Sequence, residues 1–135
     1  MPSFKLRQSK SVANALASLV SLSLVACAAP SNTIELATQA NNQCSVIESV
    51  VVMDDLLTIN AGERPTLGYA VQLTEQTQAD AKVTLMYQIT SPPKGAMVAQ
   101  MMTSPCLYVT LPKEWQTVIV INETSAQRWT FNRIE

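Results

Sequence analysis

The 135-residue sequence predicts an all-β protein. We expect a single small antiparallel β-sandwich or barrel of about six or seven strands, which follows an N-terminal signal peptide. Two observations favour this class. After residue 26, short segments in which apolar and polar residues alternate are separated by turns rich in Gly, Pro and Asn. No segment in that part of the chain has a convincing helical pattern of apolar residues.

The strands are expected one after another along the chain. The clearest is 82–88, in which Val83, Leu85 and Tyr87 alternate with polar residues. Segment 75–80 is polar and is expected to be a hairpin connection. The other strand segments are 44–53, 56–59, 69–74, 106–111, 116–121 and 128–134.

Two groups of residues invite a chemical role, but a structural role is expected for each. Asp54 and Asp55 are expected in a solvated turn or at a strand edge. An acid–base pair or a Ca²⁺ site is less favoured, because the spacing of a calcium loop is missing. Met97, Met101 and Met102 would suit an adaptable binding surface, but methionines more often fill gaps in a core, and that role is expected here.

The first 26 residues have the pattern of a signal peptide. Lys5, Arg7 and Lys10 form a basic region, and residues 11–26 are uncharged and rich in Ala, Leu and Val. This apolar part is shorter than the roughly 20 residues that a membrane-spanning helix needs. It leads into Leu-Val-Ala-Cys at 24–27, which resembles the lipobox of bacterial lipoproteins.

The lipobox resemblance implies that Cys27 carries a lipid that attaches the chain to a membrane. Two or more acyl chains hold a protein firmly on a bilayer. Ala28 stands where an inner-membrane retention signal usually has Asp. The expected location is therefore the bacterial cell envelope, on the outer membrane and facing the periplasm. Ordinary signal-peptide cleavage is the alternative, because Ala26 and Ala28 also flank Cys27 as small residues.

The segment after the lipobox is predicted to be a flexible tether. Residues 27–43 are mostly Ala, Ser, Asn, Thr and Gln, with only Ile34 and Leu36 to bury. The β-domain is then expected to span 44–135. If Cys27 is acylated, Cys44 and Cys106 remain as an even pair in an oxidising compartment. A disulfide between them is favoured over two separate buried thiols.

Composition excludes several classes of function. Removal of the leader leaves 109 of the 135 residues, with six basic and ten acidic side chains and a formal charge of −4. No basic patch is evident, so no nucleic acid is expected as a partner. The absence of histidine removes Ser-His-Asp and Cys-His pairs and the commonest transition-metal ligand. We therefore predict a protein that is not an enzyme and that holds no cofactor and no metal ion.

Three blocks in the middle of the chain resemble the PrcB-like domain. They are GERPTLGY at 62–69, SPPKGAMV at 91–98, and the segment 105–112. This domain is the C-terminal part of the protease complex subunit PrcB and occurs in many small bacterial lipoproteins. Leu67 departs from the family pattern, which usually has Gly at that place. The resemblance implies a non-catalytic subunit that helps an exported protease complex form or stay stable.

The first two blocks supply the candidate partner-binding residues. They are Arg64, Pro65, Thr66, Gly68, Tyr69, Pro92, Pro93 and Gly95. Residues 64–69 are also similar to the Asn-Pro-Thr-Thr-Gly-Tyr loop of chagasin-type cysteine-peptidase inhibitors, which implies an inhibitory role for the loop 65–69. A third interpretation is structural, in which Pro65, Gly68 and Tyr69 form a turn that sets the register of the strands.

Overall fold

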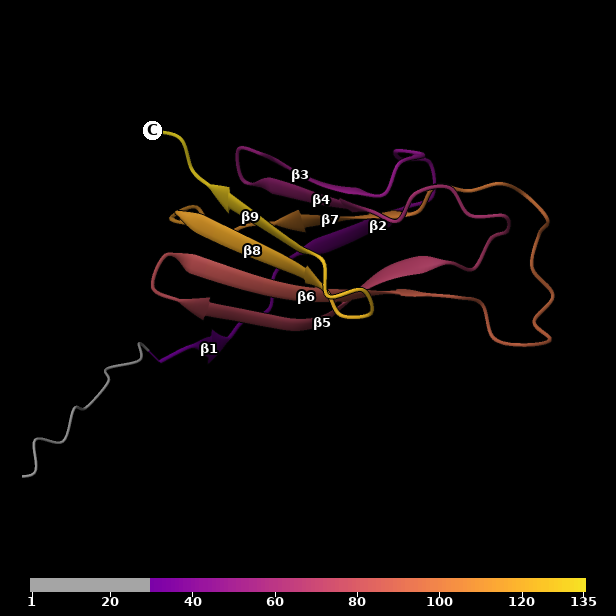
Figure 1. Ribbon diagram of the computed structural model, residues 1–135, viewed down its shortest axis with the longest axis horizontal. Helices are drawn as coiled ribbons and strands as arrows, with labels where there is room; N and C mark the ends of the chain where they lie inside the picture. Colours follow the sequence, from indigo (N-terminus) through magenta and orange to yellow (C-terminus); the bar gives the residue numbers. More distant parts are fainter. Residues whose placement is uncertain (1–29) are drawn as a thin grey trace, which may run out of the picture.

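The strands of the protein form two sheets, which a computed structural model describes over residues 30–135 (Figure 1). The predicted signal peptide and the predicted lipidation site at Cys27 lie outside the described residues. The five-stranded sheet has the order β1 (Asn32–Thr33), β5 (Ala70–Ala79), β6 (Lys82–Thr90), β8 (Thr117–Asn122) and β9 (Arg128–Asn132). The four-stranded sheet has the order β2 (Thr38–Asn41), β7 (Cys106–Thr110), β4 (Leu56–Asn60) and β3 (Ser49–Met53).

The two sheets pack face to face around one apolar core. Leu57, Ile59 and Val109 from the four-stranded sheet lie in the same buried cluster as Val83 and Leu85 from the five-stranded sheet. The alternation predicted for 82–88 is therefore correct, since its inward residues are completely buried. The all-β class is confirmed, and the strands lie in two separate sheets. Residues 30–135 contain no helix, and so none there could span a membrane.

One strand pair departs from the predicted antiparallel arrangement. β6 and β8 are parallel, with Lys82 opposite Thr117 and Tyr87 opposite Asn122. Between them the chain crosses to the four-stranded sheet, forms β7 there and returns. The intervening strand reverses the direction of the chain, so β8 runs the same way as β6. A pattern of alternating residues carries no information about this crossing.

The flexible tether predicted for 27–43 is wrong over much of its length. Asn32 and Thr33 in β1 pair with Thr77 and Gln78 of β5, and β2 pairs along its whole length with β7. All four residues of β2 are exposed, because it is an edge strand held mainly by backbone hydrogen bonds. Such a strand needs no apolar residues, and its polar composition resembles that of a linker.

Two other predicted boundaries are also corrected. Segment 75–79 belongs to β5, which continues past a bulge between Leu73 and Glu75 and turns only at Asp80. The bulge breaks the alternation on which the sequence interpretation depended. At the other boundary, 44–48 is an irregular connection instead of a buried strand, and Val46 and Ile47 are exposed. Asp54 and Asp55 form the β3–β4 turn, as expected, and Asp54 has a positive φ of 53°.

Candidate functional site

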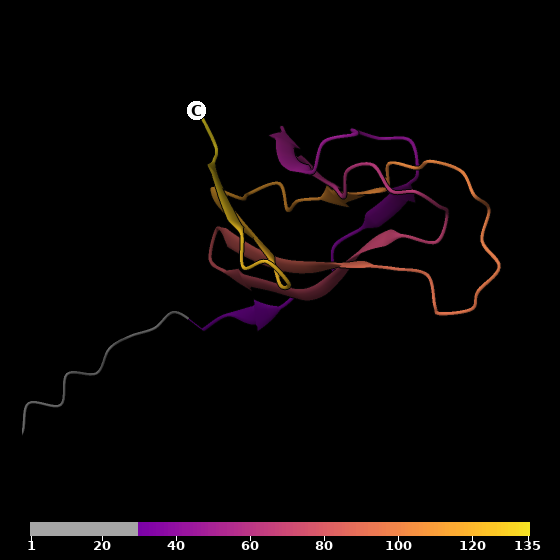
Figure 2. The same cartoon turned by 45° about the vertical axis from the view of Figure 1, so that its right-hand side comes forward.

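The two loops that carry the candidate residues lie at one end of the sandwich. Residues 62–69 precede β5, and residues 91–103 follow β6. Since β5 and β6 are antiparallel neighbours, both loops emerge from the same end of this hairpin. Figure 2 shows them projecting together, on the side away from β1. We call residues 62–69 and 91–103 the loop-end surface.

Backbone hydrogen bonds fix the two loops against each other. Arg64 and Thr103 exchange a pair of N–H···O bonds of 2.7 and 2.9 Å, and the Leu67 amide donates to the Ala99 carbonyl at 3.1 Å. The hydroxyl of Thr103 donates to the carbonyl of Thr66 at 2.9 Å. These hydrogen bonds join segments about 35 residues apart and hold the loop-end surface in shape. A surface that is already ordered does not have to be ordered on binding.

A glycine allows a close approach of the two loops. Gly68 has a φ of +95°, and a Cβ atom added to it would lie 2.8 Å from Cβ of Pro92. Only glycine adopts such a backbone conformation without strain and leaves room for the proline ring. The contact gives Gly68 and Pro92 a structural role, since it joins the two loops.

Arg64 lines a polar hollow beside the loop-end surface. Its Nη2 donates to the Ala61 carbonyl at 2.8 Å, and its guanidinium lies 5.7 Å from the ring centre of Tyr69. Its Nε is buried and has no hydrogen-bond partner among the described residues. The hollow has a volume of about 290 Å³ and is also lined by Glu48 and Asn122. A guanidinium at the wall of such a hollow suits a carboxylate or carbonyl oxygen of a partner.

Two of the residues that line this hollow, Glu48 and Asn122, belong to a chain of polar side chains that also includes Tyr87. Nδ2 of the buried Asn122 lies 3.5 Å from the hydroxyl of Tyr87 and 3.4 Å from Oε1 of Glu48. Burial raises the pKa of Tyr87 to about 12; the hydrogen bond to Asn122 acts in the opposite direction, and the nearby Glu48 adds to the rise. Tyr87 is therefore a neutral structural phenol at physiological pH, and it does not supply a base.

The tip of the loop 91–103 carries the most exposed apolar side chains of the surface. Met97 is fully exposed, and Met101 and Met102 are 54% and 61% exposed. The core role predicted for these methionines is wrong, because the loop projects beyond the sheets and offers no interior to fill. The structure is consistent with the other interpretation considered, an adaptable apolar surface. Pro93 and Gly95 are exposed at the same tip, and a Cβ added to Gly95 would meet nothing within 4 Å.

The structure contains the disulfide that was predicted between Cys44 and Cys106. Their Cα atoms are 6.0 Å apart, and the two residues are separated by 62 positions in the sequence. The Cys44 amide also donates to the carbonyl of Ser104 at 2.9 Å. The disulfide therefore links the connection between β2 and β3 to the start of β7, just after the loop-end surface.

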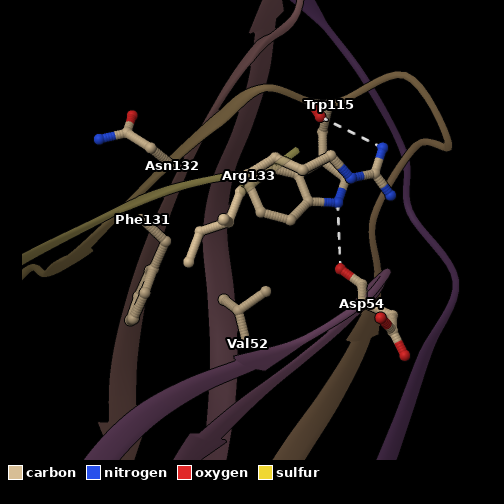
Figure 3. A pocket seen from close by; sticks show the side chains of 7 residues that line it. Val52, Asp54, Trp115, Phe131, Asn132 and Arg133 are labelled. Carbon is tan, nitrogen blue, oxygen red and sulfur yellow. Dashed lines mark hydrogen bonds between the residues drawn. The ribbon is translucent and has the colours of Figure 1, made fainter.

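A second hollow lies between the edge strands β3 and β9 (Figure 3). It has a volume of about 350 Å³, and the side chains of Val52, Phe131 and Trp115 point into it. The indole N–H of Trp115 is 3.2 Å from both the Asp54 carbonyl and Oδ1 of Asp55. Arg133 forms an ion pair with Asp55 and stacks 5.2 Å from the ring of Trp115. These contacts fix the β3–β4 turn to the C-terminal segment, which is a structural role.

The described residues offer no constellation for a metal ion. No group of three or more Asp, Glu or Cys side chains gathers anywhere in residues 30–135. In the β3–β4 turn, the carboxylate of Asp55 is paired with Arg133. The loop-end surface presents exposed thioether groups, a guanidinium and a backbone held by hydrogen bonds.

Comparison with known proteins confirms the family resemblance over the middle of the chain. The family model described as PrcB C-terminal matches residues 56–112. This range begins with β4, ends just after β7 and includes the whole loop-end surface. No curated protein and no solved structure matched the chain.

The structure brings together six of the eight candidate residues. Arg64, Pro65, Thr66, Gly68 and Tyr69 lie in one loop, and Pro92 packs on it through Gly68. Pro93 and Gly95 lie further out at the tip. Sequence reasoning missed Glu48 and Asn122, which line the hollow with Arg64. Glu48 reaches the hollow from the irregular connection before β3 and Asn122 from the end of β8, and nothing in their local sequence signals it.

Proposed function

We propose that this protein is a lipid-anchored, non-catalytic module of the bacterial envelope that binds and stabilises a protein partner through the loop-end surface. The partner we favour is a component of an exported protease complex. One observation carries the proposal: three exposed methionines and Arg64 lie on loops that hydrogen bonds already hold in shape. A loop backbone that is already ordered lowers the entropic cost of binding, and the methionine side chains can adapt to a partner.

The geometry supports an anchor at one end of the molecule and recognition at the other. β1, the first strand of the described chain, pairs with Thr77 and Gln78 near the end of β5. The loop-end surface lies at the start of β5, which is roughly 25 Å away at the usual rise of about 3.3 Å per residue. A lipid on Cys27 would therefore hold the domain by the end remote from its binding surface (Figure 1).

The family match supports the choice of partner. The matched range 56–112 contains every residue of the loop-end surface. If proteins of this family help a protease complex form, we expect residues in the matched range to make the contacts with that complex. The identity of the partner as part of an exported protease complex is itself proposed here.

Lipidation is tested at Cys27. We expect the full chain to incorporate labelled palmitate in bacterial cells and to sediment with the membrane. The acyl chains attached to the lipobox cysteine would hold the protein in the bilayer. Cys27→Ser should abolish labelling and leave a soluble or unprocessed form whose circular dichroism still shows the β-domain. Loss of the fold in this variant would show that the anchor interpretation is wrong.

Binding is tested by recovery of the tagged full chain from detergent-solubilised envelope. We expect a specific protein to co-purify, with an exported protease or one of its subunits among the products. Met97→Asp should reduce recovery about tenfold or more, because it places a charge where an apolar contact of about 1.5 kcal/mol or more is made. Ile134→Asp is the matched control, since Ile134 is also almost fully exposed but lies near the C-terminus.

Two outcomes would count against the proposal. Recovery of no specific protein would contradict a partner-binding role. Inhibition of a papain-like peptidase at nanomolar concentration, lost on changing Thr66 and Gly68, would favour the chagasin-like alternative in its place. The extensive bonding of that loop to Ala99 and Thr103 makes it part of a larger surface instead of a loop that stands alone.

A further inference from the structure

The edge strand β3 differs from the other sheet edges in the described residues. Those edges are β1, β2 and β9 in addition to β3. β1 has two residues, β2 has the polar sequence TQAN, and β9 carries exposed Arg128, Thr130 and Asn132. β3 has the sequence SVVVM and contains no charge, no proline and no bulge. Natural sheets protect their edges with such features, and an edge without them is a template for a further strand.

The backbone of β3 presents two residues outward. The two-residue turn at Asp54 and Asp55 makes Met53 and Leu56 a hydrogen-bonded pair, so Ser49 and Val51 also bond towards β4. The N–H and C=O groups of Val50 and Val52 then point away from β4. Among the described residues, no hydrogen bond outside the β3–β4 ladder uses these four groups.

The side chains next to this edge are unusually apolar for a surface. Val51 and Met53 are 44% and 71% exposed on the outer face of β3, and Leu56 is exposed opposite Met53. The ion pair of Arg133 with Asp55 and the hydrogen bonds of Trp115 hold the adjacent turn in place. The edge is therefore rigid as well as apolar, which favours the addition of a strand of similar character.

We propose that a second copy of this chain pairs with the edge, β3 against β3, in antiparallel orientation about a two-fold axis at Val51. Val50 and Val52, whose backbone groups point outward, lie symmetrically about Val51, and the segment SVVVM has no charge that would repel its own copy. Val50 of one copy then lies opposite Val52 of the other, and each pair exchanges two N–H···O bonds, four in all. The two four-stranded sheets become one continuous sheet, and the contact is closed because the same strand is used by both copies.

The alignment places Val51 directly opposite the Val51 of the partner. This is a non-hydrogen-bonded pair, whose Cβ atoms lie about 4.5–5.5 Å apart in antiparallel sheets. Thr58 lies opposite Val51 in β4 and shares its face, but it is one strand further from the axis. The two positions therefore differ in their distance from the second copy and not in their face.

Cysteine cross-linking of the full chain in detergent tests this register. Under mild oxidation, Val51→Cys should give at least about tenfold more disulfide-linked dimer on a non-reducing gel than Thr58→Cys, since cysteines whose Cα atoms are over about 7 Å apart cannot join. The unchanged chain measures any linkage through its native cysteines. Equal dimer from the two variants, or more from Thr58→Cys, would overturn the proposal.

A charge at the edge provides a second test that does not depend on oxidation. When two differently tagged copies are co-expressed, Val51→Lys should reduce their co-purification about tenfold, because like charges directly opposite repel each other in a sheet. Thr58→Lys should leave co-purification near that of the unchanged chain. Failure of the unchanged copies to co-purify, or capture of a different protein by Val51→Cys in place of a dimer, would show that β3 does not pair with a second copy.

Discussion

At the scale of single residues, the close packing of the two loops of the proposed binding surface depends on Gly68. Gly68→Ala should destabilise the protein by about 3 kcal/mol, because it combines a strained positive φ with a Cβ only 2.8 Å from Cβ of Pro92. Urea unfolding followed by circular dichroism measures this change in the free energy of unfolding.

Gly95 provides the control for the backbone strain alone. Its φ is +78°, but a Cβ there would meet nothing within 4 Å. Gly95→Ala should therefore cost only about 1 kcal/mol. If the two substitutions destabilise the protein equally, the approach of Gly68 to Pro92 is not a tight contact.

The raised pKa of Tyr87 predicts that the free energy of unfolding falls at alkaline pH. Burial raises its pKa in the folded protein from 10.0 to about 12, so folding favours the neutral phenol. Its contribution to stability is fully present below pH 10 and is lost as the pH rises towards 12. The free energy of unfolding should fall by about 2 to 3 kcal/mol over this interval on account of this group.

Tyr87→Phe isolates the effect, because it removes the titrating hydroxyl and retains the buried ring. Urea unfolding at pH values from 9 to 12 should show a shallower loss of stability in this variant than in the unchanged chain. The same slope in both proteins would mean that the phenol of Tyr87 is not held neutral by burial.

At the scale of strands and loops, the sequence predicted the segments that have one face in the core. Val83, Leu85 and Tyr87 alternate because β6 packs one face on the opposite sheet, and the pattern is visible without any structure. β2 has no such signal, since all four of its residues are exposed and its bonds are made by the backbone. β5 was divided wrongly because its bulge shifts the alternation after Leu73.

The two loops of the proposed binding surface were only partly predictable from the sequence, because contacts between distant segments shape them. Gly68 and Pro92 stand out as turn residues, but their contact joins two segments that only the pairing of β5 with β6 brings together. The exposure of Met97 depends on how far its loop extends beyond the sheets, which composition does not encode. The partners of Arg64 in the hollow, Glu48 and Asn122, come from other parts of the chain.

The disulfide is the strongest single constraint between elements. It closes a loop over a sequence separation of 62 residues, so removing it should cost about 4 kcal/mol in the chain-entropy model. Replacement of both Cys44 and Cys106 by Ala should lower the urea midpoint accordingly, with the slope of the transition showing any change in the unfolded state. A loss below about 1 kcal/mol would mean that the backbone bond from Cys44 to Ser104 and strand pairing hold this region without the disulfide.

At the scale of the whole molecule, the sandwich separates three surfaces. The first strand, β1, lies at one end, and the loop-end surface lies at the other (Figure 1). The edge strand β3 lies along the side of the four-stranded sheet. The proposed anchor, the proposed pairing of two copies and the proposed partner-binding surface therefore use different parts of the domain and do not exclude one another.

The most direct test of the central claim is site-specific photo-cross-linking in bacterial cells that express the full chain. A photoreactive amino acid at Met97 should form an adduct with one other envelope protein, because this fully exposed residue lies at the tip of the loop-end surface. The same amino acid at Ile134, which is also exposed, should give no such adduct. Absence of an adduct at Met97, or the same adducts at both positions, would contradict the assignment of the loop-end surface as the binding site.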